Sequence, residues 1–368
     1  MNTRQVTELK VISSFNEFRS IQAVWNSLLA NSSLDRVFLT HEWFTAWWQA
    51  FGDGKRLFIV YAKQKDEIIG IAPLMIWKSR FRRLPVKCIT FMKNEDSPGC
   101  SFIIKKGHEY VVRDIISFVL RDVKGWNILS LNNMQLDDGS QSAITDILDQ
   151  EKKRYIIHKG LSSPYLKLES DWDTYYKAMS AKSRKTIRNI SNRIKKLGNI
   201  RVEEYCDMGN YSDIVFITRK GWKFEEGKSF VNRKDRMKFF ELLSEIAEDN
   251  RWLSIWCIYD NETLMAYEYH LKYKNVDTAL LAEFNKEYGN ISPGAYLDYK
   301  IIENLFNNGV WEYDMCGVQD EYKRKWTRNT RNLKNITAFN GGVYAKILYF
   351  LEDILITNVK KIRRLLIR

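Results

Sequence analysis

The sequence predicts an α/β (α+β) protein with two successive domains, each a mixed, largely antiparallel central sheet flanked by helices. Helical and strand-like patterns alternate along the chain, and the second half repeats the order of the first. A length of 368 residues suits about two domains. A hydrophobic content of 45% with only 5 prolines indicates packed cores rather than disorder.

The first half is expected to open with an amphipathic helix at 15–30, because its apolar residues recur at helical spacing. Thr40 is the expected N-cap of the next helix, with Glu42 in its first turn. Trp43, Trp47 and Trp48 have helical spacing and are expected in the core. Further helices are expected at 110–124 and 140–153, and strands at 57–62, 68–77, 86–92, 100–104, 126–131 and 155–158.

The second half is expected to contain helices at 171–179, 181–197, 211–222, 235–249 and 295–307. Its expected strands are 200–206, 253–259, 263–274, 278–283 and 311–315. We place the domain boundary near Ser162-Ser163-Pro164. The expected domains are therefore 1–164 and 165–345, followed by a basic amphipathic helix at 346–368.

The net charge of +13 is concentrated in a few segments. Residues 180–201 and 322–334 carry many Lys and Arg residues and no acid. Such segments predict either an anionic partner or solvated helix faces. No nucleic-acid-binding motif accompanies them, so we do not expect nucleic acid as a partner. The 5 cysteines are widely spaced and include no CxxC pair, so neither a disulfide framework nor a metal site is expected.

The expected location is the cytoplasm. The first residues, MNTRQVTELKVISS, lack the apolar core of a signal peptide, and no run reaches the roughly 18 apolar residues of a membrane span. The tail at 346–368 has apolar residues at three- and four-residue spacing and a basic end. It is expected either to contact the inner face of a membrane peripherally or to dock on the protein's own core.

Several short sequence motifs resemble those of the CelD/BcsL group of the GNAT superfamily. This group has a BioF-type acetyltransferase domain and is related to the FemAB aminoacyl-transferases. The motifs are FLTHEW at 38–43, WWQAFG at 47–52, SAKSRKTIR at 180–188, GWK at 221–223, Ser292-Pro293-Gly294, Gly317 and YKRKW at 322–326. The resemblance covers nearly the whole chain and is strongest over 171–326. It implies two tandem GNAT-like domains and acyl transfer to an amine or hydroxyl.

The resemblance implies acyl-CoA as co-substrate and a phosphate-binding turn before the helix at 295–307. Ser292, Gly294 and Ala295 are the candidate cofactor-binding residues, since free amides at a helix start attract anions. Pro293 suits the first turn, where a missing N–H costs nothing. Ser292 stands where the family usually has a glycine. The alternative is an ordinary helix start.

Acyl transfer also needs groups that move protons, and four residues are candidates. Alternation along 263–274 puts Glu268 and His270 on one strand face, either as a base pair or as a solvated surface pair. Glu283 ends the next strand beside the expected donor turn. Tyr322 is a candidate general acid.

Five further residues are candidates for substrate binding. Trp222 and Phe230 flank a loop that could cap an acceptor pocket. Asp314 lies in an apolar strand, where a buried carboxylate needs a partner; the alternative is an ion pair with a base of 322–325. Lys323 could neutralise a phosphate. Trp326 could stack on a sugar, although the core is its simpler place.

The expected function is transfer of an acyl group, with acetyl favoured, from acyl-CoA to an amine or hydroxyl of a sugar or cell-envelope polysaccharide precursor. The expected partner is an anionic small molecule or glycan. Two alternatives stay open: a FemAB-like transferase that uses aminoacyl-tRNA, and a non-catalytic envelope-assembly protein that keeps the fold.

Overall fold

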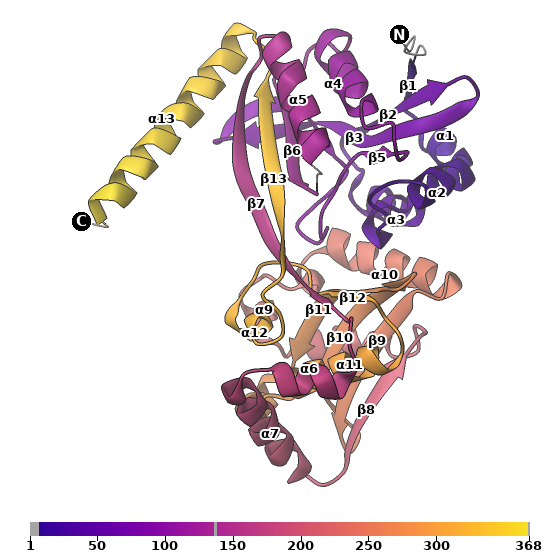
Figure 1. The fold of residues 1–368 in the computed structure, drawn as a ribbon, viewed down its shortest axis with the longest axis vertical. Helices are drawn as coiled ribbons and strands as arrows, with labels where there is room; N and C mark the ends of the chain where they lie inside the picture. Colours follow the sequence, from indigo (N-terminus) through magenta and orange to yellow (C-terminus); the bar gives the residue numbers. More distant parts are fainter. Residues whose placement is uncertain (1–6, 136–137, 367–368) are drawn as a thin grey trace. The chain divides into compact units, whose positions relative to one another are not determined.

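The computed structural model describes residues 7–135 and 138–366, in which helices and strands alternate (Figure 1). The chain forms two compact units. Unit 1 consists of the described parts of Met1–Trp48, Gly52–Gly160 and Asn332–Arg368, and unit 2 of Gln49–Phe51 and Leu161–Arg331. Each unit has a sheet flanked by helices, which confirms the predicted fold class.

The sheet of unit 1 has the strand order β1-β2-β3-β4-β6-β13-β7, and β5 pairs with β3. Strands β1 to β4 pair antiparallel, β6 joins β4 in parallel, and β13 joins β6 antiparallel. The strands are β1 (Glu8–Ile12), β2 (Lys55–Gln64), β3 (Glu67–Phe81), β4 (Leu84–Phe91), β5 (Ile103–Ile104), β6 (Ile128–Met134), β7 (Arg154–Lys167) and β13 (Thr330–Phe339).

Helices of unit 1 pack on this sheet, with α2 against β3 and α4 against β2 and β3. The helix expected at 15–30 is interrupted at Ile21, whose backbone leaves the helical range. Thr40 caps the next helix by accepting the Trp43 N–H, as predicted, and Trp43 and Trp47 are buried. The helices are α1 (Phe15–Ser20), α2 (Gln22–Ala30), η1 (Val37–Leu39), α3 (His41–Phe51), α4 (Val111–Arg121), α5 (Asp138–Gln150) and α13 (Val343–Leu366).

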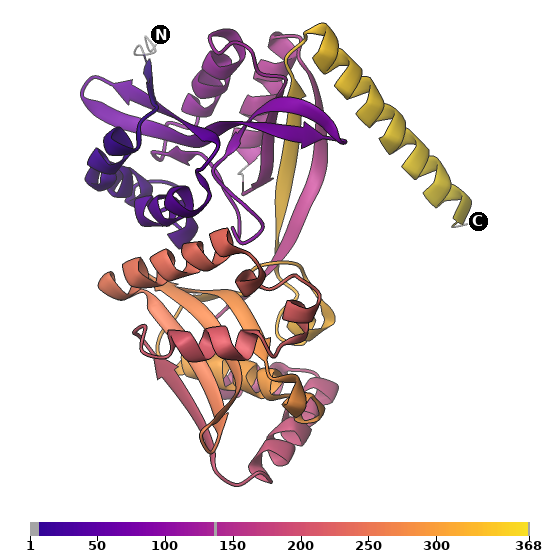
Figure 2. The ribbon, with the colours of Figure 1, turned by 180° about the vertical axis from the view of Figure 1, so that it is seen from behind.

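The sheet of unit 2 continues from the end of β7 in the order β12-β11-β10-β9-β8. Its pairs are antiparallel except for β11 and β12, which run parallel. Figure 2 shows these strands from behind. They are β8 (Ile200–Tyr205), β9 (Leu253–Asp260), β10 (Thr263–Tyr273), β11 (Val276–Phe284) and β12 (Glu312–Asp314).

Two helical layers cover the sheet of unit 2. On one face α11 packs on β9, β10 and β11 and against α6 and α7; on the other, α8 packs on β10 and β11, and α10 on β9. Apolar residues of α7, α11, β9 and β10 form the core between the first layer and the sheet. The helices are α6 (Trp172–Ala178), α7 (Ala181–Lys195), α8 (Tyr211–Thr218), α9 (Trp222–Glu225), η2 (Phe230–Asn232), α10 (Lys234–Asp249), η3 (Lys286–Ile291), α11 (Pro293–Asn307) and α12 (Glu321–Arg324).

The compact units divide the chain differently from the expected ranges 1–164 and 165–345. Ser162-Ser163-Pro164 lies inside β7, a 14-residue strand that crosses the division between the units at Gly160 and Leu161. The strand β13, which the sequence patterns did not indicate, returns the chain to unit 1 by pairing with β6. Residues from 332 onward therefore belong to unit 1.

The beginning of α13 docks on unit 1. Ala345 and Leu348 are buried against the sheet, and Glu352 accepts hydrogen bonds from Arg82 at 2.6 and 2.8 Å. The outward face of the same segment keeps large apolar side chains exposed, among them Ile347, Phe350 and Ile354. Side chains of the basic end, from 355 onward, lie outside the described ones.

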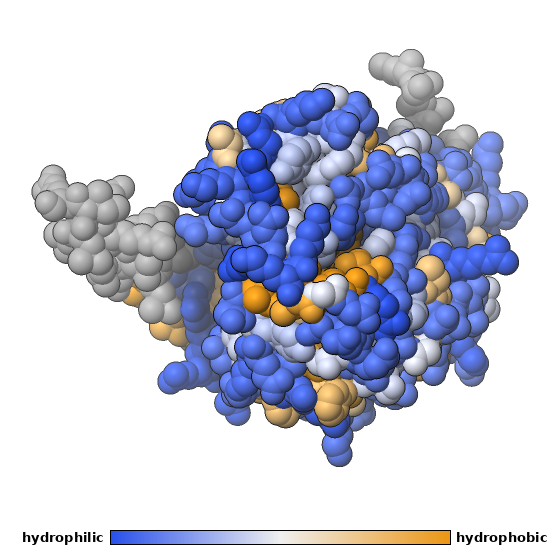
Figure 3. All heavy atoms as spheres, turned by 90° about the horizontal axis from the view of Figure 1, so that it is seen from below, coloured by the Kyte–Doolittle hydropathy of each residue, from blue (hydrophilic) through white to orange (hydrophobic). Residues whose placement is uncertain are grey.

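The surface is mostly hydrophilic, with a narrow apolar band on the face drawn in Figure 3. Most large apolar side chains lie inside the two units instead. Within residues 7–135 and 138–366, no helix combines the length and the apolar composition that crossing a bilayer requires.

Candidate functional site

The two faces of β10 carry different chemistry. Tyr267 and Tyr269 face the α8–α10 layer, where their hydroxyls meet the Thr218 hydroxyl at 2.7 Å and the Ser244 hydroxyl at 2.9 Å. Glu268 and His270 face the opposite layer, as strand alternation predicted. Both are buried, with 3% and 0% of their surface exposed, so the alternative of a solvated surface pair is wrong.

A β-bulge in β11 determines which residues join His270. Tyr269 pairs with Leu281, but His270 pairs with Ala279, so Leu280 is an extra residue. The extra residue shifts the rest of β11 by one position. As a result Asp277 lies on the His270 face, whereas an unbroken register would turn it to the opposite face.

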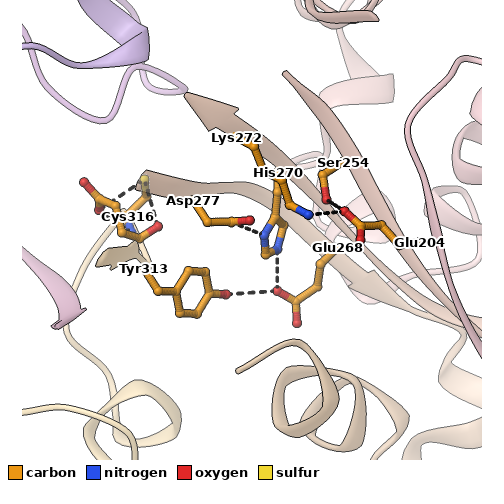
Figure 4. Close-up of polar contacts among 9 residues, drawn as sticks. Glu204, Ser254, Glu268, His270, Lys272, Asp277, Tyr313 and Cys316 are labelled. Atoms are coloured by element: carbon orange, nitrogen blue, oxygen red, sulfur yellow. Dashed lines mark hydrogen bonds and ion pairs between the residues drawn. The ribbon is translucent and has the colours of Figure 1, made fainter. Parts of the chain in front are cut away.

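His270 is held between two carboxylates (Figure 4). Its Nδ1 lies 2.5 Å from Asp277 Oδ1, and its Nε2 lies 3.1 Å from Glu268 Oε2. The Tyr313 hydroxyl donates to Glu268 Oε2 at 3.4 Å, and the Tyr313 ring stacks on the imidazole with 5.6 Å between centroids. These contacts join β10, β11 and β12 in one buried polar chain.

The protonation state of His270 follows from this enclosure. Burial on its own lowers the pKa of the imidazole, but the charges and hydrogen bonds of Asp277 and Glu268 outweigh it and raise the pKa to about 10. The ring is therefore an imidazolium at neutral pH, with both N–H groups donated to carboxylates. It has no free lone pair with which to take a proton.

A third carboxyl, Asp298 of α11, completes the buried cluster. Its Oδ2 accepts from Trp326 Nε1 at 3.2 Å and lies 3.8 Å from Lys325 Nζ. Its Oδ1 accepts from no N–H or O–H group of the described residues. Burial first, and then the charge of Glu268, raise the pKa of Asp298 well above its usual value. The environment therefore favours the protonated form of the Asp298 carboxyl.

Tyr322 connects this cluster to the surface. Its side chain is 40% exposed, yet burial of its hydroxyl and the charges of Asp298 and Glu268 raise the pKa of the phenol well above its usual value. Lys325 Nζ lies 5.4 Å from the centre of the Tyr322 ring. Lys323 donates to the Cys316 carbonyl oxygen at 2.8 Å and so supports the loop behind Tyr322.

Asp314 has a different partner from the one expected. Its Oδ2 lies 3.3 Å from Arg331 Nη1, and its Oδ1 accepts the Cys316 N–H at 3.0 Å. The Arg331 guanidinium also contacts Glu312 and lies 3.9 Å from the centre of the Tyr165 ring. The alternative of an ion pair within 322–325 is therefore wrong, because β13 supplies the cation. Asp314 acts in a structural ion-pair network.

Glu283 lies on the other face of the sheet from Glu268. Its carboxylate is 3.6 Å from Lys223 Nζ, and Gly221 lies so close that an added Cβ would stand 2.7 Å from the carboxyl carbon. Oε1 has no hydrogen-bond donor among the described residues. Burial outweighs Lys223 and raises the pKa of this carboxyl. The structure thus separates Glu283 from the cluster that contains Glu268.

The three aromatic candidates differ in exposure. Trp222 is 42% exposed on α9 and remains free to contact a substrate. Phe230 is buried, with its ring 5.3 Å from that of Phe240, so its expected place in an acceptor pocket is wrong. Trp326 is also buried, in agreement with the simpler of its two expected places.

The start of α11 is an open helix terminus. Ser292 adopts the left-handed conformation, with φ of 60° and ψ of 57°, and its side chain makes no capping hydrogen bond. A Cβ added at Gly294 would meet nothing within 4 Å, so the space beside this turn is open. The Gly294 and Ala295 N–H groups form no hydrogen bond with the described residues, as is usual in the first turn of a helix.

Strands β11 and β12 part beside this terminus. They pair only over Val276–Thr278 and Glu312–Asp314. Beyond Asp314 the chain follows β7, since the Met315 N–H donates to the Pro164 carbonyl oxygen at 3.1 Å. From Ala279 onward, no described strand pairs with the edge of β11 that faces β12. Lys223 contacts this edge by donating a hydrogen bond to the Ala282 carbonyl oxygen at 2.7 Å.

The sequence reasoning missed Asp277, Asp298 and Lys325. A signal for Asp298 exists, because it shares the helical stripe of Leu297, Ile301 and Leu305, where a carboxyl is unexpected. Asp277 could not have been assigned to the His270 face without knowledge of the bulge.

Comparisons with known proteins agree with this architecture. Residues 181–324 match the family model of an acetyltransferase (GNAT) domain. The crystal structure of FemX is similar, with 9% identity and a TM-score of 0.62 over 93% of this chain and 100% of that chain. A tandem GNAT protein from the clavulanic acid biosynthesis pathway is similar too, with 10% identity and a TM-score of 0.51 over 91% of this chain and 99% of that chain. The structure of L-PGS from Bacillus licheniformis is similar too (11%, 0.51, 92% and 96%). No curated protein matches the sequence. At such identities the likeness shows the fold: two GNAT-like units in tandem.

Proposed function

Because residues 181–324 carry an acetyltransferase domain of the GNAT family, we propose that this protein moves an acyl group, acetyl by preference, from acyl-CoA to an amine or hydroxyl of a sugar-containing envelope precursor. Unit 2 holds the reacting groups. In this proposal unit 1 supports the acceptor, and the reaction takes place in the cytoplasm.

The parting of β11 and β12 beside the open start of α11 is the observation that carries the proposal. The Gly294 and Ala295 amides, together with the positive end of the helix dipole, suit the diphosphate of a coenzyme. Arg193, which donates to the Asn290 carbonyl oxygen at 2.7 Å, adds a cation near this turn. Asp298 lies four residues, about 6 Å, further along the same helix.

The proton chemistry is assigned to the two ends of the buried cluster. The acceptor nitrogen or oxygen forms a bond with the thioester carbonyl carbon, and the carbon–sulfur bond then breaks. The proton lost by the acceptor passes to the carboxyl pair Glu268–Asp298, and the Tyr322 hydroxyl donates its proton to the departing thiolate. Proton transfer from the carboxyl pair to Tyr322 restores the starting state, so the cycle is balanced.

His270 acts as a positioning residue in this scheme rather than as the base. Both of its nitrogens are occupied by carboxylates, so it orients Glu268 and balances its charge. Asp277 in turn fixes the ring. The arrangement fixes the orientation of the Glu268 carboxylate.

Two measurements test the proposal. Calorimetric titration should detect acetyl-CoA binding, and incubation with acetyl-CoA and nucleotide-linked amino sugars should give a product heavier by one acetyl group. Glu268→Gln should remove turnover and leave the folded structure intact, while Glu262→Gln, at a side chain that is 93% exposed, should behave like wild type. Absence of acetyl-CoA binding at about 1 mM, equivalent to a binding free energy weaker than about 4 kcal/mol, would exclude the proposal.

A second candidate is transfer from aminoacyl-tRNA. It is favoured by the exposed cations of α7, including Lys182, Lys185 and Arg188, which could contact a polyanionic donor. Activity that is sensitive to ribonuclease and independent of coenzyme A would support this candidate over the first.

A further inference from the structure

A cavity of about 410 Å³ lies in unit 2 and is lined in part by Lys325 and Trp326, which also contact the buried Asp298. One wall is the junction between α6 and α7, including Ser180 and Ser183. The other wall is the end of α12 with the segment that follows it, including Arg324, Lys325 and Arg328. We call it the basic cavity. It brings together two segments, 180–188 and 322–326, that lie far apart in the sequence.

The charges that line the basic cavity are all positive. It includes three cationic side chains and no carboxylate. Arg324 and Arg328 are exposed and form no ion pair with any described residue, unlike Arg331, three residues further along the chain. The three cationic side chains repel one another, and a bound anion would offset this repulsion.

Hydrogen bonds fix both walls in place. Ser180 Oγ accepts the Ser183 N–H at 3.1 Å, and the two hydroxyls lie 2.8 Å apart. Only one of these hydroxyl protons is used between them, so the other can be donated to a ligand. Tyr175 donates to the Trp326 carbonyl oxygen at 2.5 Å and ties the walls together. The site is therefore preformed.

We propose that the basic cavity binds the phosphate or diphosphate group of the acceptor. This inference rests on the proposed function for the identity of the acceptor. Guanidinium groups and a serine hydroxyl can donate hydrogen bonds to phosphate oxygens. The cavity is separate from the start of α11, which is assigned to the coenzyme. In this arrangement the diphosphate of the donor binds at the start of α11, and the phosphate of the acceptor binds in the basic cavity.

Lys325 links the basic cavity to the carboxyl pair. Lys325 lines the cavity, and its ammonium lies 3.8 Å from Asp298 Oδ2. A bound phosphate competes with Asp298 for this cation, and loss of the cation favours the protonated carboxyl. Acceptor binding therefore favours the protonated form of the Asp298 carboxyl until the acyl group is transferred.

Titration of the full-length protein with inorganic pyrophosphate tests the proposal without turnover. Wild type should bind, and Arg324→Gln with Arg328→Gln should weaken binding by about 10-fold or more, since each loses charged hydrogen bonds. Arg188→Gln, an exposed arginine of α7 outside the cavity, is the matched control and should leave binding unchanged. Acetyl-CoA should not displace pyrophosphate.

Three results would overturn the inference: no pyrophosphate binding at about 10 mM, equal loss in the control variant, or full displacement by acetyl-CoA. Because acetyl-CoA binding is measured separately, failure here is distinguishable from failure of the proposed function. Uridine diphosphate and a short isoprenyl diphosphate then distinguish nucleotide-linked from lipid-linked acceptors. Tighter binding than pyrophosphate by one of them identifies the carrier.

Discussion

His270 Nδ1 and Asp277 Oδ1 lie 2.5 Å apart, although regular pairing of β10 with β11 would put the two side chains on opposite faces. The single extra residue, Leu280, brings them together. The bulge therefore accounts for the imidazolium at the centre of the site, and through it for the fixed orientation of Glu268.

Asp277→Asn should destabilise the protein by about 3 kcal/mol, because it leaves one side of a buried imidazolium without its counter-charge. Urea unfolding followed by fluorescence measures this loss. Asp66→Asn, at a fully exposed carboxylate, is the control and should have little effect. Equal stability of the Asp277 variant and wild type would mean that His270 is neutral.

The stability of wild type should fall as the pH rises from about 6.5 to about 10. The pKa of His270 is raised in the folded protein, so its contribution is complete below the pKa of 6.5 in the unfolded chain and disappears as the pH passes about 10. Unfolding midpoints across this range measure the slope. In Asp277→Asn the slope should shrink, and an unchanged slope would assign the effect to another group.

Ser292→Gly should stabilise the protein by about 1 kcal/mol, because a non-glycine residue in the left-handed conformation carries a steric cost. Ser292→Ala retains a Cβ and should be close to wild type, since the serine side chain makes no capping hydrogen bond. Thermal unfolding of the three proteins provides the comparison. A stabilising alanine variant would argue against this explanation.

Tyr322→Phe should lower kcat by about 100-fold while KM stays close to wild type, since the change removes a proton donor and keeps the ring. Steady-state kinetics with acetyl-CoA and an amino-sugar acceptor measures both constants. Tyr299→Phe, which loses only a hydrogen bond to Glu303, is the control. If kcat did not change, Tyr322 would have no part in proton transfer.

The outward face of α13 should bind anionic lipid surfaces, because exposed Ile347 and Ile354 precede a basic sequence end. Co-sedimentation with vesicles that contain phosphatidylserine should recover the protein, and Ile347→Asp with Ile354→Asp should prevent it. Vesicles of phosphatidylcholine alone are the control. Equal binding to both kinds of vesicle would rule out the electrostatic contribution.

The sequence predicted most of the helices and strands of unit 2, because their apolar periodicity is strong. It also put Glu268 and His270 on the same face, since strand alternation depends on local geometry alone. Asp277 was beyond it, because a bulge decides where that carboxyl lies. Asp298 has a sequence signal, its place in an apolar helical stripe, but the packing of α11 decides which residues it meets. The division between the compact units falls between Gly160 and Leu161, a few residues before Pro164, and β7 passes through it without a turn.

Unit 2 is inserted into unit 1, and β13, the strand between β6 and β7, comes from beyond the insertion. During synthesis, nearly all of unit 2 is translated before β13. Unit 1 begins first but lacks β13, an internal strand of its sheet, until unit 2 has been translated. We therefore expect unit 2 to fold before unit 1 is complete. The edges of β6 and β7 that pair with β13 stay unpaired until β13 has been made.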